Sequence, residues 1–355
     1  MTGLKTALFK AGLEALYRTQ SHRLMRPFTG GMGAILTLHH VRPKSAGEFA
    51  PNSLLEIAPA FLEQTIQSVR ANGFDIISLD EACDRLTGGV RRAPFVVFTF
   101  DDGYRDNAEF AYPILKKHGV PFTIYLPTAF MDRLGEPWWL VIEEVIAQRD
   151  KVTAKVGDEV RPFDCSTPQL KARAFHAIYW WVRALPAEAI PSYAQSLATS
   201  HGIDYGALCR RLCTDLCMDW DELRSLGADP LVTFGAHTVD HPMLAKLDAD
   251  SVHEQMSASR ARLERELDRR IDHFAYPVGD PTSAGPREFA IARDLAFRSA
   301  VTTRPGVIFP EHAQHMMALP RVSLNGHYQS RRYLEVLLSG APFLLFNGFS
   351  RVNAA

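Results

Sequence analysis

Two acidic residues and two histidines form a set of side chains that could bind a divalent metal ion. Asp101 and Asp102 directly follow an apolar run, Phe95–Phe100, and His237 and His241 follow another apolar run much later in the chain. Catalytic zinc sites commonly use three protein ligands and keep one position open. Asp102, His237 and His241 would supply that number. A spacing of four predicts that one helical turn carries both imidazoles on the same side.

The second carboxylate, Asp101, is then left for proton transfer. Neighbouring residues at a strand end point in different directions, so Asp102 can bind the metal while Asp101 reaches a water molecule. A bound metal would polarise a carbonyl group and make that water more acidic. Taken alone, Asp-Asp-Gly is equally typical of a plain turn with a capping aspartate. The combination of the two pairs, each after an apolar run, favours a metal-dependent hydrolase.

Short apolar runs separated by helical patterns predict the elements that position these residues. The runs are typical of buried strands; they are Ala34–Leu38, Phe74–Leu79, Phe95–Phe100, Phe122–Leu126, Leu231–Phe234, His273–Tyr276, Phe297–Thr302 and Ala318–Val322. Helical periodicity is clear over Pro59–Ala71 and Ser251–Ile271. Strands alternating with helices predict an α/β fold with a parallel sheet closed into a barrel.

The alternation suggests four parts of the chain. Residues 1–30 form an N-terminal amphipathic helix, and residues 31–130 and 227–330 form one discontinuous barrel domain. Residues 131–226 form a mainly helical insertion with a hairpin within Lys151–Val160, and residues 331–355 form a C-terminal segment. Insertions on a barrel usually lie over its active-site end. Trp138 and Trp139 in the insertion are suited either to stacking on sugar rings or to core packing.

Charge and apolar patterning limit the partners and the compartment. With 39 basic and 40 acidic residues the net charge is −1, which argues against a nucleic-acid partner. The chain contains no uninterrupted run of about 18 apolar residues, so we expect no membrane-spanning helix. The start of the chain does not resemble a signal peptide, so we expect a cytoplasmic protein. Three cysteines spaced four apart, Cys209, Cys213 and Cys217, favour a packing stripe over a zinc site.

The N-terminal segment leaves two alternatives open. Apolar residues recur at helical spacing among basic residues; they are Leu4, Leu8, Ala11 and Ala15. A basic amphipathic helix of this kind can lie on an anionic membrane, which would place the protein at the periphery of the inner membrane. The same helix can instead dock on the barrel domain.

Three motifs resemble those of a known family. Thr99–Tyr104 is similar to the first motif of the polysaccharide deacetylases of carbohydrate esterase family 4, the NodB-homology domain. His237–Pro242 resembles the second motif, and Phe274–Gly279 resembles the third in its FAYPxG form. The resemblance implies a distorted (β/α)7-type barrel and hydrolysis of an N-acetyl group on an amino sugar. It also implies that Asp101 is the base, and that Asp102, His237 and His241 hold Zn²⁺, or else Ni²⁺, Co²⁺ or Mn²⁺.

The same resemblance suggests how the substrate is held. The third motif would line the site with Tyr276 and Val278, and a backbone N–H near Val278 would stabilise the oxyanion of the tetrahedral intermediate. Many members carry an arginine that orients the base at the position of Ala275. Arg321 is the expected replacement here, with an unrelated ion pair as the alternative.

The general acid also departs from the usual pattern, because no late Leu-x-His motif is present. Leu36–Val41 resembles an early strand of the branch that acts on poly-N-acetylglucosamine, in which that strand supplies the acid. The resemblance therefore assigns the acid to His39, with His40 second, although both could simply end a strand.

We expect a metal-dependent N-deacetylase acting on an N-acetylated sugar in a polysaccharide, an oligosaccharide or a glycan precursor. Two alternatives remain at this stage. One is a deformylase or deacetylase of a lipid-linked sugar, and the other is a degenerate domain that binds glycan without cleaving it.

Overall fold

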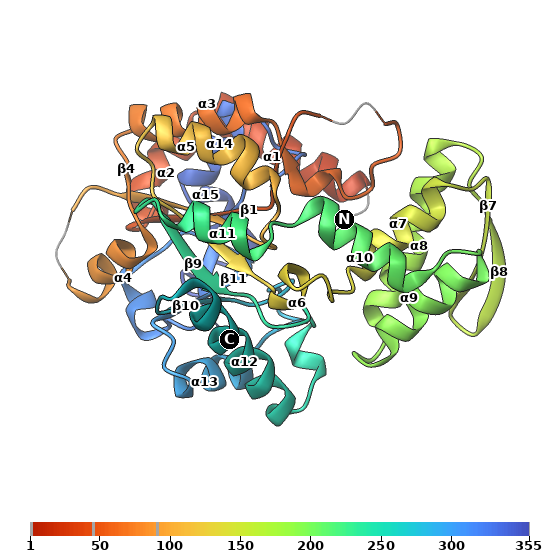
Figure 1. Cartoon of the computed structure of the whole chain (residues 1–355). Coiled ribbons are helices and arrows are strands. Elements are labelled where there is room, and N and C mark those ends of the chain that lie inside the picture. The colour runs from red at the N-terminus through yellow and green to blue at the C-terminus, as the bar shows by residue number, and fades with distance from the viewer. Residues whose placement is uncertain (1–2, 45–46, 90–91, 355) are drawn as a thin grey trace.

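A closed ring of parallel strands forms the centre of the molecule (Figure 1). The computed structural model describes residues 3–44, 47–89 and 92–354. Neighbouring strands hydrogen-bond in the order β1-β12-β11-β10-β9-β6-β5, β5 pairs with β1 to close the ring, and β4 pairs with β5 from outside. The strands are β1 Gly33–Leu38, β4 Asp75–Ile76, β5 Phe95–Phe100, β6 Phe122–Leu126, β9 Val232–Ala236, β10 His273–Ala275, β11 Ser299–Pro305 and β12 Leu319–Ser323. Each predicted apolar run overlaps one of them, although only Asp75 and Ile76 of the run Phe74–Leu79 form a strand and Leu79 already begins a helix. The predicted (β/α)7-type barrel is confirmed.

Alternate residues of each strand face either the inside of the barrel or the surrounding helices, as the two-residue period of a strand requires. The cluster inside the barrel includes Ile35, Val97, Tyr125, Ala275, Val301 and Leu319. The layer between strands and helices includes Leu36, Phe98, Ile124, Phe274 and Val322. This alternation decides which side chains at the strand ends can reach a common site.

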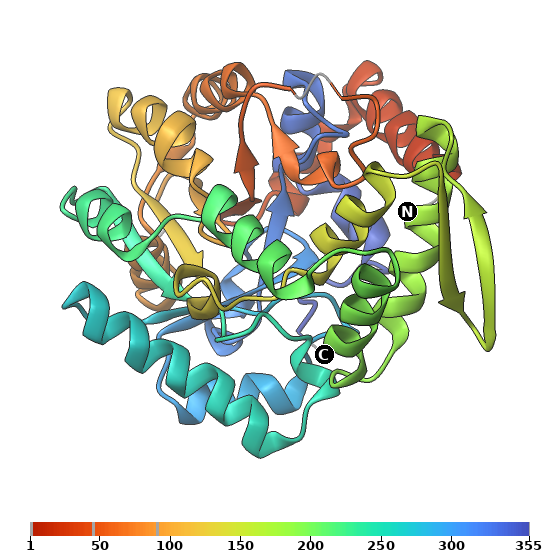
Figure 2. The same ribbon diagram turned by 45° about the vertical axis from the view of Figure 1, so that its right-hand side comes forward.

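Helices surround the ring, as Figure 2 shows. They are α3 Pro59–Ala71, α4 Leu79–Thr87, α5 Tyr112–Lys117, α6 Thr128–Met131, α11 Trp220–Gly227, α12 Ala249–Leu267 and α13 Pro286–Asp294. Short single-turn segments connect them: η1 Ser53–Leu55, the π-helical η2 Asn107–Ala111, η3 Leu244–Lys246 and η4 Pro310–Gln314. A small parallel pair joins β2 His40–Val41 to β3 Glu56–Ile57. In α3, the apolar face predicted from the sequence is buried against the barrel.

The insertion forms a helical unit with its own core at one side of the barrel (Figure 1). Its elements are α7 Trp138–Ala147, β7 Lys151–Val156, β8 Glu159–Asp164, α8 Pro168–Ala184, α9 Ala189–Ser200 and α10 Tyr205–Leu216. The predicted hairpin is present and extends to Asp164. Leu223 and Leu226 of α11 belong to the barrel core instead. The separate helical core therefore ends near residue 216 rather than at residue 226.

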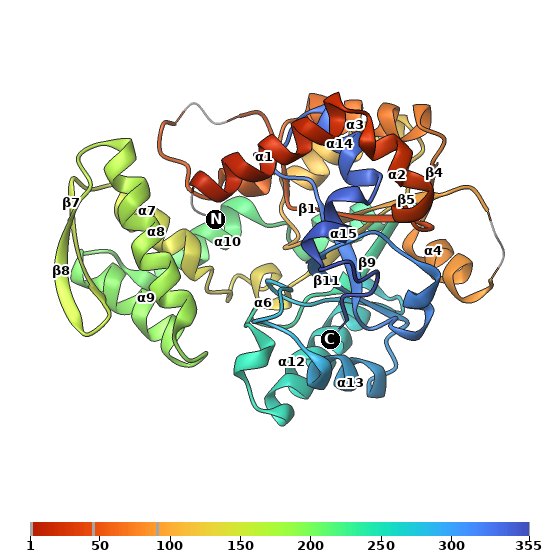
Figure 3. The ribbon, with the colours of Figure 1, turned by 180° about the vertical axis from the view of Figure 1, so that it is seen from behind.

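Helices from the two terminal segments of the chain pack side by side on the barrel (Figure 3). The single helix predicted for residues 1–30 is two helices, α1 Gly3–Arg18 and α2 Ser21–Thr29. The C-terminal segment contains α14 Arg331–Leu338, which packs on α1 and α3, and α15 Ala341–Phe346, which packs on α2.

The N-terminal helix docks on the domain through a different face from the predicted stripe. Leu13 of α1 is buried, and Phe9 meets the ring of Tyr328 edge-on, with ring centroids 5.3 Å apart. The predicted stripe residues Leu8, Ala11 and Ala15 are exposed, whereas the side chain of Leu4 lies outside the described part of the structure. The α1 helix thus docks on the domain, and the described residues of the predicted apolar stripe face outward.

The structure also bears on the expectations about membrane-spanning helices and about the cysteines. Among the described residues no helix combines the length and apolar character needed to cross a bilayer. All five cysteines are free and buried, and Cys209 and Cys213 pack among apolar residues as expected.

Replacing Gly235 tests how closely the barrel interior is packed. A Cβ atom at Gly235 in β9 would lie 2.5 Å from Cδ1 of Tyr125, whose ring fills the interior. We expect Gly235→Ala to lower the free energy of unfolding by about 1–3 kcal/mol in denaturant titrations because overpacked cores strain their neighbours. Gly12→Ala is the matched control, because nothing lies within 4 Å of its Cβ. That control should raise the free energy of unfolding by about 0.5–1 kcal/mol. Equal stability of the Gly235→Ala and parent proteins would contradict the packing described.

Candidate active site

The polar residues singled out in the sequence gather at the carboxyl end of the barrel strands. Asp101 and Asp102 follow β5, His237 follows β9, and His39 follows β1. Arg321 projects inward from β12, two residues after Leu319, which faces the barrel interior. Because all ring strands are parallel, their carboxyl ends meet at one edge, where barrel enzymes place their active sites.

Asp102, His237 and His241 form a group suited to one metal ion. One ligand atom from each lies within 4.8 Å of the others. The Nε2 atoms of His237 and His241 lie 3.5 Å and 3.3 Å from Oδ1 of Asp102. Asp102 and His237 are buried, and His241 is half-buried.

The chemistry of these three groups fits a cation between them. His237 Nδ1 lies 2.7 Å from the carbonyl oxygen of Ala275, which can only accept, so Nδ1 carries the proton. In the neutral ring, Nε2 then presents a lone pair toward the carboxylate. Oδ1 of Asp102 is buried and has no hydrogen-bond partner among the described residues. Electron-rich atoms that face one another in this way are typical of a metal site in which a hydrogen bond from the other ring nitrogen orients the histidine ligand.

The backbone reaches this arrangement differently from the sequence prediction. His237 and His241 do not share a helical turn, because the segment between them is a loop with positive φ at Thr238 (66°) and His241 (59°). The two rings nevertheless meet, with centroids 4.9 Å apart. Asp102 also has a positive φ of 72°. Such conformations cost about 1–3 kcal/mol each and cluster at functional sites.

Asp101 is held by an arginine inside the barrel. Arg321 Nη1 donates to Oδ1 of Asp101 and Nη2 donates to Oδ2, both at 2.7 Å. The guanidinium also donates through Nε to the carbonyl oxygen of Thr302 at 2.8 Å. Both side chains are almost fully buried. Bidentate pairs of this kind fix the plane of the carboxylate as well as its charge.

The electrostatics of the two aspartates differ in origin. Burial raises the pKa of Asp101, but the guanidinium of Arg321 outweighs this and lowers the pKa below its usual value. Burial likewise raises the pKa of Asp102, and hydrogen bonds from His237 and His241 lower it well below the ordinary range when the facing ring nitrogens carry protons. Both groups are therefore carboxylates at neutral pH, and Arg321 balances only one of them.

His39 and His40 have different surroundings. Nε2 of His39 lies 3.9 Å from Oδ2 of Asp101, at the edge of the metal group. Burial lowers the pKa of His39, although Asp102 and Asp101 act to raise it. His40 instead pairs with Asp106 through Nδ1 at 2.6 Å and stacks on the ring of Tyr104. His40 is thus built into the wall of the site, and His39 faces it.

The third motif is placed only partly as predicted. Tyr276 does not present its hydroxyl to the site, because the residue is buried and its hydroxyl donates to the carbonyl oxygen of Met317 at 2.9 Å. The reason is strand alternation, since Ala275 faces the barrel interior and its neighbour faces the helices. Val278 has a φ of 63°, rare for a β-branched residue. Its carbonyl oxygen accepts from Thr303 Oγ1 at 2.6 Å, and its N–H has no backbone acceptor within the described ranges.

The insertion contributes a wall to the site. The ring of Trp139 in α7 lies 5.1 Å from the ring of His241, and Phe130 lies on the same imidazole at 6.0 Å. Trp138 turns the other way and stacks on Tyr179 of α8. Both tryptophans pack in the core, and Trp139, the more buried of the two, also lies against His241, a proposed metal ligand.

Hydrogen bonds and an ion pair fasten the insertion to the loops of the site. Arg183 of α8 pairs with Asp280, which follows the third motif. On the other side, the N–H of Arg105, just after the first motif, donates to the carbonyl oxygen of Leu216, the last residue of α10, at 2.7 Å. The insertion is thus tied to two of the loops that carry the motifs.

Sequence reasoning missed two threonines that support Asp101. Thr99 Oγ1 accepts from Arg321 Nη1 at 3.1 Å and donates to the carbonyl oxygen of Leu36. Thr37 Oγ1 lies 3.4 Å from Oδ2 of Asp101. Both face the barrel interior, and counting two residues back from Asp101 and His39 would have found them.

Comparisons with known proteins identify the family of the chain. The model of the polysaccharide deacetylase family matches residues 88–158 and 168–298, more than half of the chain. A protein from Bacillus subtilis (strain 168), YxkH, assigned to the polysaccharide deacetylases, is 36% identical over 73 residues, which are 20% of this chain. The match spans about a quarter (26%) of that relative's length.

Solved structures share the fold at low sequence identity. The deacetylase PplD of Streptococcus pyogenes, solved with acetate, has a TM-score of 0.54 at 19% identity, covering 83% of this chain and 93% of that one. IcaB from Ammonifex degensii has a TM-score of 0.52 at 20% identity, covering 86% and 98%. The family match includes Asp101, Asp102, His237, His241 and Val278, whereas His39 and Arg321 lie outside it. The chain belongs to the polysaccharide deacetylase family.

Proposed function

We propose that this protein is a metal-dependent hydrolase that removes N-acetyl groups from an amino sugar in a glycan or glycan precursor. The observation that carries the proposal is the buried group Asp102, His237 and His241 beside a carboxylate, Asp101, that Arg321 holds in place. Family membership supports a carbohydrate substrate.

The proposed metal ligands are Asp102, His237 and His241. A divalent cation held there, Zn²⁺ in our proposal, would polarise the acetyl carbonyl and make a nearby water more acidic. The hydrogen bond from His237 Nδ1 to Ala275 fixes the tautomer that such a ligand needs.

Asp101 is the proposed general base. It lies next to the metal group, but Arg321 occupies both of its oxygens from inside the barrel. The carboxylate is therefore fixed in direction, and each oxygen keeps a second lone pair that can accept a proton. In this position it takes a proton from the attacking water as the bond to the acetyl carbon forms.

The oxyanion that forms on the acetyl group needs a hydrogen-bond donor. We assign this role to the N–H of Val278, because the two hydrogen bonds between Thr303 and the Val278-Gly279 turn hold that backbone in place. A preorganised donor of this type commonly contributes about 3–4 kcal/mol to transition-state stabilisation.

His39 is the proposed general acid for the departing amine. It faces Asp101 at 3.9 Å. Burial lowers its pKa and so favours the neutral ring, whereas the charges of Asp102 and Asp101 favour the protonated form that a general acid needs. As the C–N bond breaks, protonated His39 donates its proton to the nitrogen of the leaving amine, and transfer of the proton held by Asp101 to His39 returns both residues to their starting forms.

A glycan-binding domain without catalysis is a weaker interpretation. Binding alone needs no carboxylate fixed beside a metal group, whereas burying the Asp101–Arg321 pair has a large desolvation cost. A lipid-linked sugar remains a substrate alternative to polymer or oligomer, and the assay below includes it.

Asp101→Asn tests the base. We expect the release of acetate from N-acetylglucosamine oligomers, or from a lipid-linked N-acetylated sugar, to fall at least about 100-fold, since general-base catalysis contributes 10²–10⁴-fold. Metal content should not change. Asp158→Asn, in the exposed hairpin turn, is the control. An unchanged rate in Asp101→Asn would refute the assignment.

Arg321→Lys tests the orientation of the base. Lysine keeps the charge but loses the bidentate geometry, so we expect kcat to fall about ten-fold or more while bound metal stays constant. Arg298→Lys is the matched control, because Arg298 also pairs with two aspartates, Asp80 and Asp84, away from the site. Equal losses in the two variants would show a general effect on stability instead.

Metal removal tests the ligand group. A chelator should abolish activity, and Zn²⁺ at 100 times its Kd should stabilise the chelated protein by about 2.7 kcal/mol. Asp102→Asn should lose most of this stabilisation in thermal melts, and His176→Gln, an exposed histidine of the insertion, should keep it. If Zn²⁺ stabilises Asp102→Asn as much as the parent, these residues do not form the site.

A further inference from the structure

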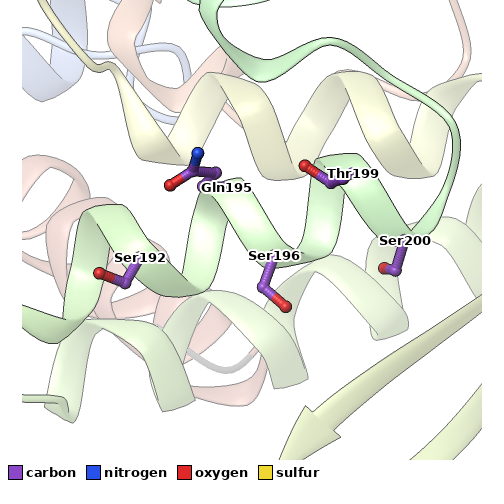
Figure 4. Close-up of a pocket in the computed structure, with 5 residues that line it drawn as sticks. All are labelled: Ser192, Gln195, Ser196, Thr199 and Ser200. Atoms are coloured by element: carbon purple, nitrogen blue, oxygen red, sulfur yellow. The ribbon is translucent and has the colours of Figure 1, made fainter.

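A pocket of about 720 Å³ lies at the opposite end of the barrel from the metal group. Its walls include Gly31 and Met32, which precede β1, and Pro94 and Phe95, at the start of β5. The α2 helix forms a third side. In contrast, the open hollow on α9 in Figure 4 is lined only by small or uncharged side chains of that one helix.

The charged side chains that line this pocket are all basic. Five arginines line it and no carboxylate does; they are Arg23, Arg26, Arg85, Arg92 and Arg351. Arg85 already forms ion pairs with two carboxylates, those of Asp75 and Glu81. Three of the others are exposed and have only long ion pairs, at 3.7 Å for Arg23, 3.8 Å for Arg92 and 3.5 Å for Arg351.

Arg26 differs from its neighbours because it has no carboxylate partner among the described residues. Its guanidinium lies 4.5 Å from the ring centroid of Phe74 and donates to the carbonyl oxygen of Asn72 at 3.3 Å. Burial lowers its pKa, so the charge is partly desolvated and lacks an opposite charge beside it. An anionic group in the pocket would complete this arrangement.

Large apolar side chains are exposed next to the arginines. Leu24 and Phe28 are one turn apart on α2 and are 76% and 72% exposed. Phe28 itself lines the pocket. Phe346 of α15 and Phe349 after it are 65% and 70% exposed, and α15 packs on α2 (Figure 3). Arg351, two residues after Phe349, returns the chain to the pocket wall.

We propose that α2, α15 and this arginine-lined pocket form a docking surface for a membrane containing anionic phospholipid. Phosphate groups pair with the arginines, and Leu24, Phe28, Phe346 and Phe349 enter the interface. Charge complementarity favours this occupant because arginine binds phosphate well and anionic bilayers attract basic surfaces. A nucleic acid would match the charge but would leave the exposed leucine and phenylalanine side chains in water.

The proposal does not depend on the proposed catalytic activity, because the surface and the metal group lie at opposite ends of the strands. Docking through this end would direct the carboxyl ends of the strands, with Asp101 and the metal group, away from the bilayer. The exposed stripe on α1 is not needed for this contact.

Vesicle flotation of the full chain tests the surface. We expect binding to vesicles of phosphatidylcholine with phosphatidylglycerol, little binding to phosphatidylcholine alone, and weakening by salt. Arg23→Gln with Arg26→Gln should reduce affinity about five-fold per arginine, since each basic residue near an anionic surface contributes about 1 kcal/mol. Leu24→Ser with Phe28→Ser should reduce it at least as much.

Matched controls replace residues of the same kind elsewhere. Leu134→Ser removes a side chain that is 74% exposed, and Arg265→Gln removes an exposed arginine of α12. Both should bind like the parent. Leu24 and Phe28 are exposed, so the apolar variant should stay folded in thermal melts even if Arg26→Gln does not. The proposal is overturned if neither vesicle type binds, if both bind equally, or if free glycerol phosphate binds while vesicles do not.

Discussion

Two adjacent carboxylates buried at the end of one strand are the constraint on which the site depends. Removing an ionised carboxylate from water is costly unless a partner compensates it. Arg321 compensates Asp101 with two hydrogen bonds of 2.7 Å. Asp102 faces two imidazoles and keeps one oxygen without a partner in the described structure. One carboxylate is therefore satisfied by the protein, and the other is arranged for a cation.

The barrel makes this division possible through its strand alternation. Asp101 follows the inward-facing residues of β5 at the two-residue period, and Arg321 is an inward-facing residue of β12. The two side chains therefore meet inside the ring. Ala275 on β10 is small and inward-facing, and it leaves the interior free for an arginine that arrives from another strand. Asp102, one residue later, turns out of this set with a positive φ. Adjacent carboxylates thus acquire different partners.

Much of this arrangement could be predicted from the sequence, because apolar runs and the order of motifs can be recognised without knowing how the side chains pack. The strands, the Asp102, His237 and His241 group, and the contact between Arg321 and Asp101 were expected, and the structure contains each of them. The catalytic roles stay predictions. The errors came from local backbone geometry. Nothing in Thr238 or His241 signals a left-handed conformation, so a helical turn was expected where a loop is present.

Other errors concerned which side of a strand or helix faces the site or the barrel. Tyr276 was assigned to the site although its neighbour Ala275 takes the inward position, a conflict that the two-residue period alone could have exposed. In α1 apolar residues occur on more than one side, so helical spacing could not show that Phe9 and Leu13, rather than Leu8, Ala11 and Ala15, meet the barrel. Which face of a helix is buried depends on the partner surface, here α14, which lies more than three hundred residues away along the chain.

The insertion contributes to the walls of the site without supplying any of the proposed metal ligands. It has its own core and can therefore vary independently of the barrel. Its Trp139 nevertheless reaches the imidazole of His241, and its Arg183 pairs with Asp280 beside the third motif. Because these contacts fall on the loops and not on the inward-facing strand residues, changes in the insertion alter the walls of the site first. The Asp101–Arg321 pair, shielded inside the ring, remains insulated from them.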